Sequence, residues 1–202
     1  MTKEEIIKKF LLKKYQQNLI EKYLKLLTTY NSHTNVVGRS TLLDPWQSHV
    51  LDSLQILPFI DDKKKSLLDM GTGAGLPGVI LNICGCKNAT LVDSNGKKIN
   101  FLKLVNSEMN LGINLVLGRL EKIKNQKYDI ITSRALADLN KLFTYSQKFI
   151  KKNTVIIFLK GKTVNDEIGF ARNNWSFDII KHQSVSDKRG SLIIVKNLKK
   201  ND

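Results

Sequence analysis

One glycine-rich stretch constrains the fold of this chain more than any other: Ser-Leu-Leu-Asp-Met-Gly-Thr-Gly-Ala-Gly-Leu-Pro-Gly, from Ser66 to Gly78. Its apolar first half, which closes on Asp69, predicts a short buried strand, and the closely spaced glycines predict a tight turn directly after it. Such a turn lets the backbone approach a nucleotide-like ligand. A second short apolar run ends on Asp93, where an acid can accept hydrogen bonds from both hydroxyls of a ribose. Together the two segments predict a doubly wound α/β domain that binds a cofactor containing adenosine.

The spacing of the glycines separates two classes of cofactor. Residues 73–78 fit the pattern G-x-G-x-x-G of dinucleotide-binding enzymes, which is weak evidence by itself. However, the strand closes on Asp69, and the glycines begin two positions later as Gly71, Gly73 and Gly75, which is the pattern of S-adenosylmethionine-dependent methyltransferases. An acid at the strand end can face the ammonium of the cofactor's methionine part, whereas it would repel a pyrophosphate.

These residues also fit structural roles without a ligand. The glycines would suit a tight turn that binds nothing. Asp93 would suit a turn or a helix cap, and Ser94 could equally cap the next helix. Three closely spaced glycines and a following acid rarely coincide by chance, so a cofactor loop is the favoured interpretation.

The composition is basic, with 33 Lys and Arg against 18 Asp and Glu in 202 residues, a formal charge of +15. A surplus of this size favours a polyanionic partner, because each phosphate that a protein neutralises releases condensed counterions. The lysines are scattered, so a generally basic surface is the alternative. Charge therefore favours nucleic acid as the partner without locating the surface that binds it.

Other features of the chain predict a cytoplasmic protein. No apolar segment approaches the ~20 residues that a membrane span needs, and the N-terminus lacks the apolar core of a signal peptide. Cys84 and Cys86 are too few for a structural zinc site, so we expect free thiols in a reducing compartment and no bound metal. We expect a monomer that binds no membrane.

Apolar periodicity divides the chain at about residue 62. Residues 1–62 predict a helical extension that packs on the rest, with one helix from about residue 4 to 30 and a second that Asp44 caps and Pro45 opens. Residues 63–202 predict a Rossmann-like methyltransferase domain that ends in an antiparallel hairpin, which is typical of class I methyltransferases. We expect strands at 66–70, 90–93, 113–117, 128–133, 154–160, 177–185 and 192–195, and helices at 77–84, 96–109, 138–150 and 163–172.

Six short motifs occur in the order and spacing of one known family: the loop Gly71–Gly78, His49-Val-Leu-Asp-Ser53, Leu91-Val-Asp-Ser94, Arg119-Leu-Glu121, Ser133-Arg-Ala135 and Leu159-Lys-Gly161. By these motifs the chain resembles the ribosomal small-subunit methyltransferase G family, RsmG, also called glucose-inhibited division protein B. The resemblance runs from the first helix to the last strand. The chain departs from the family pattern at Ala74, at Asn35-Val-Val and at Ser48, which leaves the cofactor residues intact.

The resemblance implies transfer of a methyl group from S-adenosylmethionine to N7 of one guanine in the decoding-region hairpin of 16S rRNA. The substrate would be free rRNA or the assembling small ribosomal subunit. The resemblance also implies that Gly71 and Leu76 contact the cofactor, that Leu120 and Glu121 line its adenine side, and that Arg134 reaches its pocket from a strand end. The predicted cofactor site further includes Asp69, Gly73, Gly75, Asp93 and Ser94.

The chemistry of guanine N7 fits a sparse catalytic site. N7 presents a lone pair, so its methylation needs no general base, and we expect catalysis to rest on orientation. The motif that amine-modifying enzymes place after the fourth strand, Asn or Asp with Pro-Pro and an aromatic, is replaced here by Ser133-Arg134-Ala135. We predict no certain catalytic residue, and Arg134 is the candidate for orientation, with a structural ion pair as its alternative. His49, Asp52 and Ser53 predict a polar cluster of unassigned role.

Three basic residues are the predicted RNA contacts. Lys160 and Lys162 flank Gly161 at the carboxyl end of the fifth strand, the edge where ligands bind in open α/β sheets. Arg119 follows the third strand. Ordinary surface cations are the alternative for all three. Two other function classes remain open from the residues alone: a methyltransferase of small molecules or proteins, and a non-enzymatic module that binds RNA or NAD.

Overall fold

The computed structural model describes residues 1–201, and its strands form a seven-stranded sheet. The strands are β1 (Leu67–Met70), β2 (Ala89–Asp93), β3 (Asn114–Leu117), β4 (Tyr128–Arg134), β5 (Ile150–Lys160), β6 (Trp175–Gln183) and β7 (Ser191–Lys200). Their order is β3-β2-β1-β4-β5-β7-β6; the first five are parallel, and β7 runs antiparallel to both β5 and β6. The predicted class I methyltransferase fold, with its C-terminal antiparallel hairpin, is confirmed.

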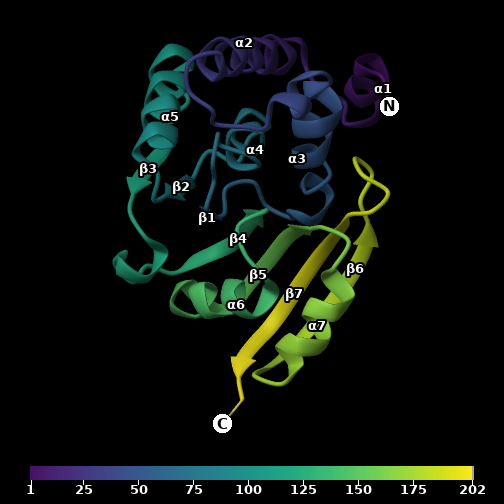
Figure 1. The fold of residues 1–202 in the computed structure, drawn as a ribbon, viewed down its shortest axis with the longest axis vertical. Helices are drawn as coiled ribbons and strands as arrows, with labels where there is room; N and C mark the ends of the chain where they lie inside the picture. The colour runs from purple at the N-terminus through teal and green to yellow at the C-terminus, as the bar shows by residue number, and fades with distance from the viewer. Residues whose placement is uncertain (202) are drawn as a thin grey trace.

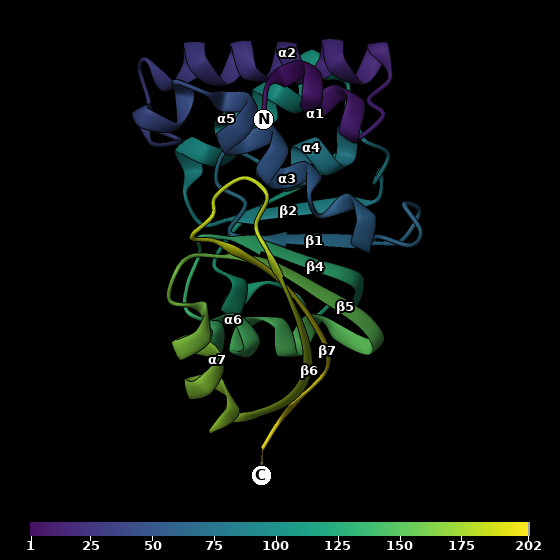
Figure 2. The same ribbon diagram turned by 90° about the vertical axis from the view of Figure 1, so that its right-hand side faces the viewer.

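Helices cover both faces of the sheet (Figure 1). One face carries α2 (Lys14–Asn31), α4 (Gly78–Ile83) and α5 (Gly96–Met109), with α1 (Lys3–Lys9) and α3 (Asp52–Leu54) beside them. The other face carries α6 (Leu139–Ser146) and α7 (Val164–Arg172). Figure 2 shows the sheet as the middle layer between these two groups, with the loop between β6 and β7 reaching toward α3.

The sheet separates two apolar clusters because neighbouring residues of a strand point to opposite faces. On β1, Leu67 belongs to the cluster that includes the N-terminal helices, α4 and α5, whereas Leu68 belongs to the cluster under α6 and α7. Both faces of β1 are therefore buried, which explains why all its residues except Asp69 are apolar. The first cluster is continuous with side chains before residue 62, and the division of the chain at that residue stays a prediction.

The helix predicted from about residue 4 to 30 consists of two helices, α1 and α2. The chain turns at Leu11, whose φ of 50° lies in the left-handed region. Gln16 then caps the start of α2, since its side-chain oxygen accepts a hydrogen bond from the Lys13 amide at 2.9 Å. Ile6 and Ile20, on either side of the break, are both fully buried. The apolar pattern therefore continues across the break, and the sequence gives no sign of it.

The second predicted helix begins with a π-helical turn over Trp46–Leu51 and continues as α3. Asp44 caps this segment as predicted, because its Oδ1 accepts a hydrogen bond from the Gln47 amide at 3.0 Å. Gln47 does not complete a capping box, because its side-chain oxygen accepts from the Met1 amino group at 3.2 Å, while its side-chain nitrogen donates to the Ser186 carbonyl oxygen at 2.9 Å. Isolated π-turns often occur at functional sites, where they reorient a few side chains.

Two of the last three strands are longer than predicted, and the helix predicted at 138–150 is shorter. β5 begins at Ile150 and β7 extends to Lys200, whereas β6 keeps the predicted length and is shifted by two residues, to Trp175–Gln183. α6 ends at Ser146 and passes through a 3-10 turn into β5. A tight turn at 187–190 connects β6 to β7, since the Gly190 amide donates to the Asp187 carbonyl oxygen at 2.9 Å.

Candidate functional site

Two adjoining cavities open where the parallel strands end. The large cavity, of about 1080 Å³, is lined by the glycine loop, by Arg134, by the segment around His49 and by the loop between β6 and β7. The small cavity, of about 450 Å³, is lined by the residues that follow β2, β3 and β4. Gly71, Lys98 and Ala135 line both cavities, so the two meet at these residues. This edge is where open α/β sheets bind ligands.

Two glycines of the loop face the cavities. Gly71 and Gly73 have φ values of 65° and 62°, in the left-handed region that favours glycine. A Cβ atom on Gly71 would overlap Leu136, whereas the nearest atom to a Cβ on Gly73 would be Lys98 Nζ at 3.9 Å. Gly73 therefore leaves open space beside the large cavity, as expected for a backbone that a ligand approaches.

Gly75 has a packing role in this loop. It is buried and lines neither cavity, and a Cβ atom there would overlap Val79 and Leu102. Its φ of 95° adds a second requirement for glycine. Gly75 thus lets the loop pack on α4 and α5, and its predicted contact with the cofactor stays a prediction. Leu76 lines the large cavity, as the predicted site requires.

Asp69 also has a structural role. Its side chain is fully buried and lines neither cavity. The carboxylate accepts hydrogen bonds from the Thr72 hydroxyl, from the Gly78 amide at 3.1 Å and from the Thr132 hydroxyl at 2.9 Å. Burial raises the pKa of Asp69 to about 6, against the lowering effect of these hydrogen bonds. Asp69 therefore holds the glycine loop from beneath, and its predicted contact with the cofactor's ammonium stays a prediction.

Asp93 occupies the position predicted for a ribose acid. It lines the small cavity at the end of β2. Its two oxygens accept hydrogen bonds from the Gly73 and Asn95 amides, each at 2.8 Å, which ties β2 to the glycine loop. Each oxygen keeps a lone pair for a further donor. Ser94 lines the same cavity, but the cap of α5 is Asn95, whose side chain accepts from the Lys97 and Lys98 amides.

The residues after β3 complete the small cavity. Leu120 is buried against it and supplies an apolar surface, and Glu121 is exposed at its rim. Lys148 fixes this segment, since its ammonium donates to the Glu121 carbonyl oxygen at 3.0 Å. Arg119 lines the same cavity and is exposed. The predicted RNA contact Arg119 thus lies beside the predicted cofactor residues.

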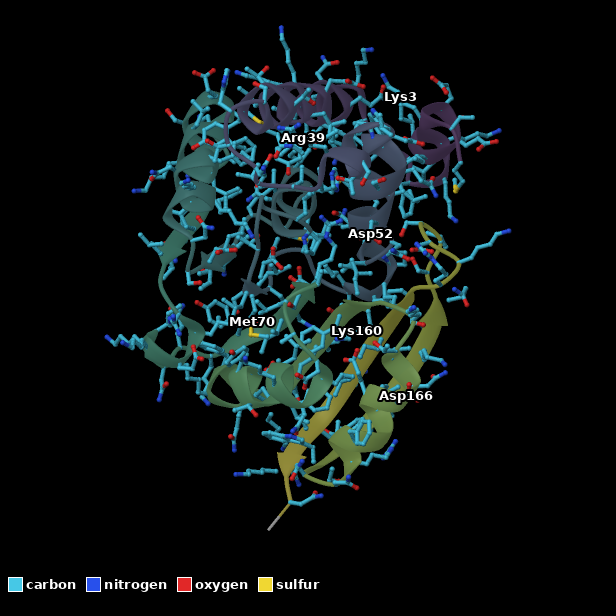
Figure 3. The ribbon with its side chains drawn as sticks, viewed as in Figure 1. Lys3, Arg39, Asp52, Met70, Lys160 and Asp166 are labelled. Carbon is cyan, nitrogen blue, oxygen red and sulfur yellow. The ribbon has the colours of Figure 1, made fainter. Side chains whose placement is uncertain are left out.

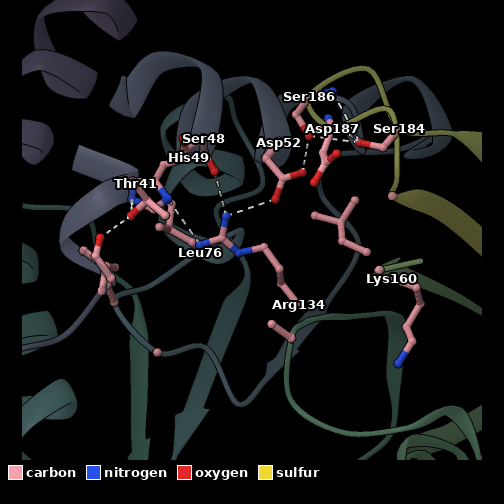
Figure 4. Close-up of a pocket in the computed structure, with 18 of the residues that line it drawn as sticks. Thr41, Ser48, His49, Asp52, Leu76, Arg134, Lys160, Ser184, Ser186 and Asp187 are labelled. Carbon is pink, nitrogen blue, oxygen red and sulfur yellow. Dashed lines mark hydrogen bonds and ion pairs between the residues drawn. The ribbon is translucent and has the colours of Figure 1, made fainter. Parts of the chain in front are cut away.

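Arg134 lies at the centre of a polar network in the large cavity (Figure 4). One of its terminal nitrogens donates to the Ser48 carbonyl oxygen at 3.1 Å and to Asp52 Oδ2 at 3.0 Å. The other lies 3.4 Å from His49 Nδ1. Burial and the neighbouring positive charge of Arg134 lower the pKa of His49 to about 4.

The two predicted lysine contacts lie in different environments. The Lys160 side chain is only 8% exposed, and its ammonium pairs with Glu167 at 2.6 Å and donates to the Ala137 carbonyl oxygen at 2.7 Å. In Figure 4 its ammonium points away from Arg134. Lys160 also lines the large cavity, and the phosphate contact expected of it stays a prediction. Lys162 is exposed two residues farther along and keeps the position expected of an RNA contact.

Three features of the site were missed in the sequence. The buried Tyr23 hydroxyl donates to the Ala74 carbonyl oxygen at 2.9 Å and so holds the glycine loop from α2. Lys98 extends from the first turn of α5 to both cavities. The loop 184–190 forms one wall of the large cavity. The available signal for Tyr23 was a tyrosine within an apolar helix pattern. The available signal for the loop 184–190 was a cationic turn between two strands.

The charged and thiol groups elsewhere suggest no further chemistry. Within residues 1–201, no group of three or more His, Cys, Asp or Glu could hold a metal ion. Cys84 and Cys86 are free and buried, and burial raises their pKa values to about 12 and about 11. None of the helices in this described part is both long and apolar enough for a membrane crossing. Side chains that end in nitrogen and side chains that end in oxygen both extend from the outline of the molecule (Figure 3).

Comparison of sequences identifies close relatives. Residues 16–195 match the family described as "GidB: rRNA small subunit methyltransferase G". The chain is 36% identical over 190 residues to the ribosomal RNA small subunit methyltransferase G of Rickettsia prowazekii (strain Madrid E), which covers 93% of this chain and 98% of the relative. It is also 36% identical over 181 residues to the protein of the same name from Rickettsia akari (strain Hartford), with 90% and 94% covered.

Comparison of structures supports the fold. The ribosomal protein L11 methylase of Lactobacillus delbrueckii subsp. bulgaricus superposes with a TM-score of 0.60 at 20% identity, over 72% of this chain and 76% of that chain. The glycopeptide N-methyltransferase MtfA, crystallised with sinefungin, superposes with a TM-score of 0.62 at 8% identity, over 73% and 94%. Taken with the sequence matches, these results show that the chain belongs to the rRNA small subunit methyltransferase G family and is an S-adenosylmethionine-dependent methyltransferase.

Proposed function

We propose that this protein methylates N7 of one guanine in the decoding-region hairpin of 16S rRNA. The main support for this proposal is that, within residues 1–201, no acidic or histidine side chain in the large cavity is free to act as a base. The two acidic residues of this cavity within the described chain are both ion-paired, Asp52 with Arg134 and Asp187 with Arg189. Its histidine, His49, has a pKa lowered to about 4 and engages a partner through each ring nitrogen. A cavity without a free base suits N7, which has a lone pair and loses no proton on methylation.

The residues around the small cavity fit the adenosine part of S-adenosylmethionine. Asp93 retains free lone pairs for ribose hydroxyls, Leu120 offers an apolar surface for a base, and Ser94 and Glu121 add polar groups at the rim. Gly71, at the junction of the cavities, and Gly73 leave the backbone accessible toward the large cavity. When bound, the cofactor supplies a methyl group on a positively charged sulfur.

The large cavity would then hold the target guanine. Arg134 cannot use its common fork to guanine O6 and N7, because a donor on N7 would occupy the lone pair that forms the new bond. Its free donors would instead meet O6, a phosphate or an acceptor of the cofactor. The protein's part in catalysis is orientation of the donor carbon and N7, which can contribute several kcal/mol, about 7 or more in well-oriented systems.

The RNA backbone would be bound by cations around the large cavity. Lys98, Lys188 and Arg189 line it, and Lys162 is exposed next to Gly161, which also lines it. The exposed Arg119 extends this set to the small cavity. The overall charge of +15 supports a polyanionic substrate, either 16S rRNA or the assembling small subunit. We propose further that the protein acts as a monomer in the cytoplasm.

Mass mapping of modified nucleosides tests this function. We expect 16S rRNA from cells that lack the gene to lose one 7-methylguanosine in the decoding-region hairpin. The purified protein should restore it in small subunits from those cells, with S-adenosylmethionine as the donor. Unchanged 16S rRNA would contradict the proposal. Methyl transfer to a protein or a small molecule instead would favour the alternative class of methyltransferase.

A further inference from the structure

The segment His49–Ser53 has a geometry that the proposed function leaves unexplained. The three polar side chains predicted to cluster do not meet one another. The Ser53 hydroxyl donates to the His49 carbonyl oxygen at 2.7 Å, within its own helix. His49 and Asp52 instead both approach Arg134, from across the large cavity (Figure 4). The motif is therefore organised around a side chain more than 80 residues later in the sequence.

The hydrogen bonds around His49 assign its protonation state. An arginine side chain can only donate, so His49 Nδ1 must carry the lone pair that faces Arg134. The Thr41 hydroxyl donates to the Gly38 carbonyl oxygen at 2.6 Å, so its oxygen accepts from His49 Nε2 at 3.0 Å. His49 is thus neutral, with its proton on Nε2. The pKa of about 4 agrees with this assignment.

Both carboxylate oxygens of Asp52 also accept hydrogen bonds from fixed donors. Its Oδ2 accepts from Arg134 at 3.0 Å. Its Oδ1 accepts from the Gln55 side-chain amide at 2.9 Å and from the Ser186 hydroxyl. The carboxylate is therefore fixed from two sides, by its own helix and by the loop 184–190. A fixed carboxylate fixes the guanidinium that it binds, because the geometry of this pair is directional.

The three bonds to Ser48, His49 and Asp52 leave two donors of Arg134 without a partner in residues 1–201. These are the Nε–H and one hydrogen of the nitrogen that faces His49. Arg134 lines the large cavity, so both donors are available to an acceptor bound there. A guanidinium held on one side by three fixed acceptors presents its other donors in a defined direction.

We propose that His49 and Asp52 are positioning residues, which orient Arg134 so that its two free donors meet an oxygen acceptor of the bound reactants. The inference rests on the proposed function, because the acceptor is part of the guanosine or of the cofactor. Neither residue exchanges a proton with the substrate. His49 acts by a lone pair on Nδ1 and Asp52 by its charge and its fixed geometry.

Two substitutions of His49 separate these roles. In His49→Asn the side-chain oxygen lies near the place of Nδ1 and keeps an acceptor for Arg134. In His49→Gln the amide nitrogen lies near the place of Nε2 and keeps the donor to Thr41, while the acceptor is removed. We expect single-turnover methylation of unmethylated small subunits to fall on the order of 10- to 100-fold in His49→Gln and to fall much less in His49→Asn. Ser53→Ala is the matched control on the same helix, with an unchanged rate.

A double-mutant cycle shows whether His49 and Asp52 act through Arg134. In an Arg134→Lys background, whose ammonium lacks the guanidinium fork, His49→Gln and Asp52→Asn should lower the rate by less than a third of their effect in the wild-type background, about threefold at most for a tenfold effect. Full additivity in both cycles would overturn the proposal. An equal loss in His49→Gln, His49→Asn and Ser53→Ala would also overturn it, by showing that the helix had distorted.

A measurement without catalysis separates this inference from the proposed function. The ¹⁵N chemical shifts of the His49 ring should show a proton on Nε2 and an unprotonated Nδ1 down to about pH 5, since the pKa of His49 is lowered to about 4. In Arg134→Ala the pKa of His49 should rise, because the neighbouring positive charge is removed. If the wild-type protein methylates no rRNA, the proposed function fails, while the ring shifts still decide the arrangement. A proton on Nδ1 would overturn it.

Discussion

The Tyr23 hydroxyl donates a 2.9 Å hydrogen bond to the carbonyl oxygen of Ala74, so α2 holds the glycine loop in place. Tyr23→Phe removes this donor alone and leaves a buried carbonyl oxygen without it. We expect the free energy of unfolding to fall by ~1–3 kcal/mol and the affinity for S-adenosylhomocysteine to fall with it, because the loop loses support. Urea denaturation and calorimetry measure the two effects. Tyr30→Phe is the matched control, since the Tyr30 hydroxyl bonds to the Lys97 carbonyl oxygen in an exposed position.

Alanine substitutions at Gly73 and Gly75 should differ in their effects: the first should mainly weaken cofactor binding, and the second should mainly destabilise the fold. A Cβ atom at Gly73 meets open space, so Gly73→Ala should destabilise the fold by only the left-handed backbone cost of about 1–2 kcal/mol, while its methyl group weakens cofactor binding. A Cβ atom at Gly75 overlaps Val79 and Leu102. Gly75→Ala should therefore add an overpacking cost of about 1–3 kcal/mol. Thermal unfolding and calorimetry distinguish the profiles; the reverse ranking would show that the loop's orientation has been misjudged.

Asp93→Ala tests the predicted ribose contact. The substitution removes the acceptors of the Gly73 and Asn95 amides as well as the lone pairs left for ribose hydroxyls. We expect the binding free energy of S-adenosylmethionine to weaken by ~1.5–3 kcal/mol, the range for hydrogen bonds to a charged group. Calorimetry on a variant whose circular dichroism matches the wild type gives the value. Unchanged affinity would remove Asp93 from the cofactor site.

The Asp69 carboxyl should make stability depend on pH in a defined direction. Burial raises its pKa from 3.8 to about 6, so the native state binds a proton more readily than the unfolded chain. The contribution of Asp69 to the free energy of unfolding is fully present below the pKa that Asp69 has in the unfolded chain. It is lost as the pH rises through about 6. The stability of the wild type relative to Asp69→Asn should thus fall by on the order of 3 kcal/mol between about pH 4 and pH 7. His49, whose pKa is lowered to about 4, makes stability rise with pH in both proteins, so its effect cancels in the difference between the wild type and Asp69→Asn. A difference that is flat with pH would contradict this.

The two lysines near the end of β5 should respond differently to substitution. Lys162 is exposed, so Lys162→Glu should weaken rRNA binding and reduce the dependence of log affinity on log salt by ~0.7–0.9 for each phosphate that the variant no longer neutralises. Lys160 is paired with Glu167 in a partly buried position, so Lys160→Met should instead destabilise the fold by about 1–3 kcal/mol. Filter binding over a salt series and chemical denaturation measure these effects. Equally weakened RNA binding in both variants would contradict the assignment.

The sequence predicted the central part of the fold because its signals are local. The run at Ser66–Gly78 contains the strand, the turn and the start of α4 in consecutive residues, and Asp93 follows its strand directly. The alternation of strands and helices then leaves few topologies, since parallel strands require crossovers of one hand. The fold class follows from these constraints.

Interactions between distant segments could not be predicted in the same way. The pattern at Asp69 is identical whether the carboxylate faces a ligand or lies beneath the loop, and only the packing of Thr132 from β4 decides. Lys160 looked like a surface cation because its partner, Glu167, lies on the following helix. The break at Leu11 was hidden because apolar residues on both sides reach the same core.

The loop between β6 and β7 also has a consequence for the order in which the protein matures. Ser186 bonds to Asp52 across 134 positions of sequence, and Gln55 and Gln47 hold the same loop. During synthesis the glycine loop and the strand that carries Arg134 leave the ribosome before this loop exists. A nascent chain therefore contains the cofactor residues while one wall of the large cavity is missing. Assembly of the enzyme ends with the contact that completes the place for its substrate.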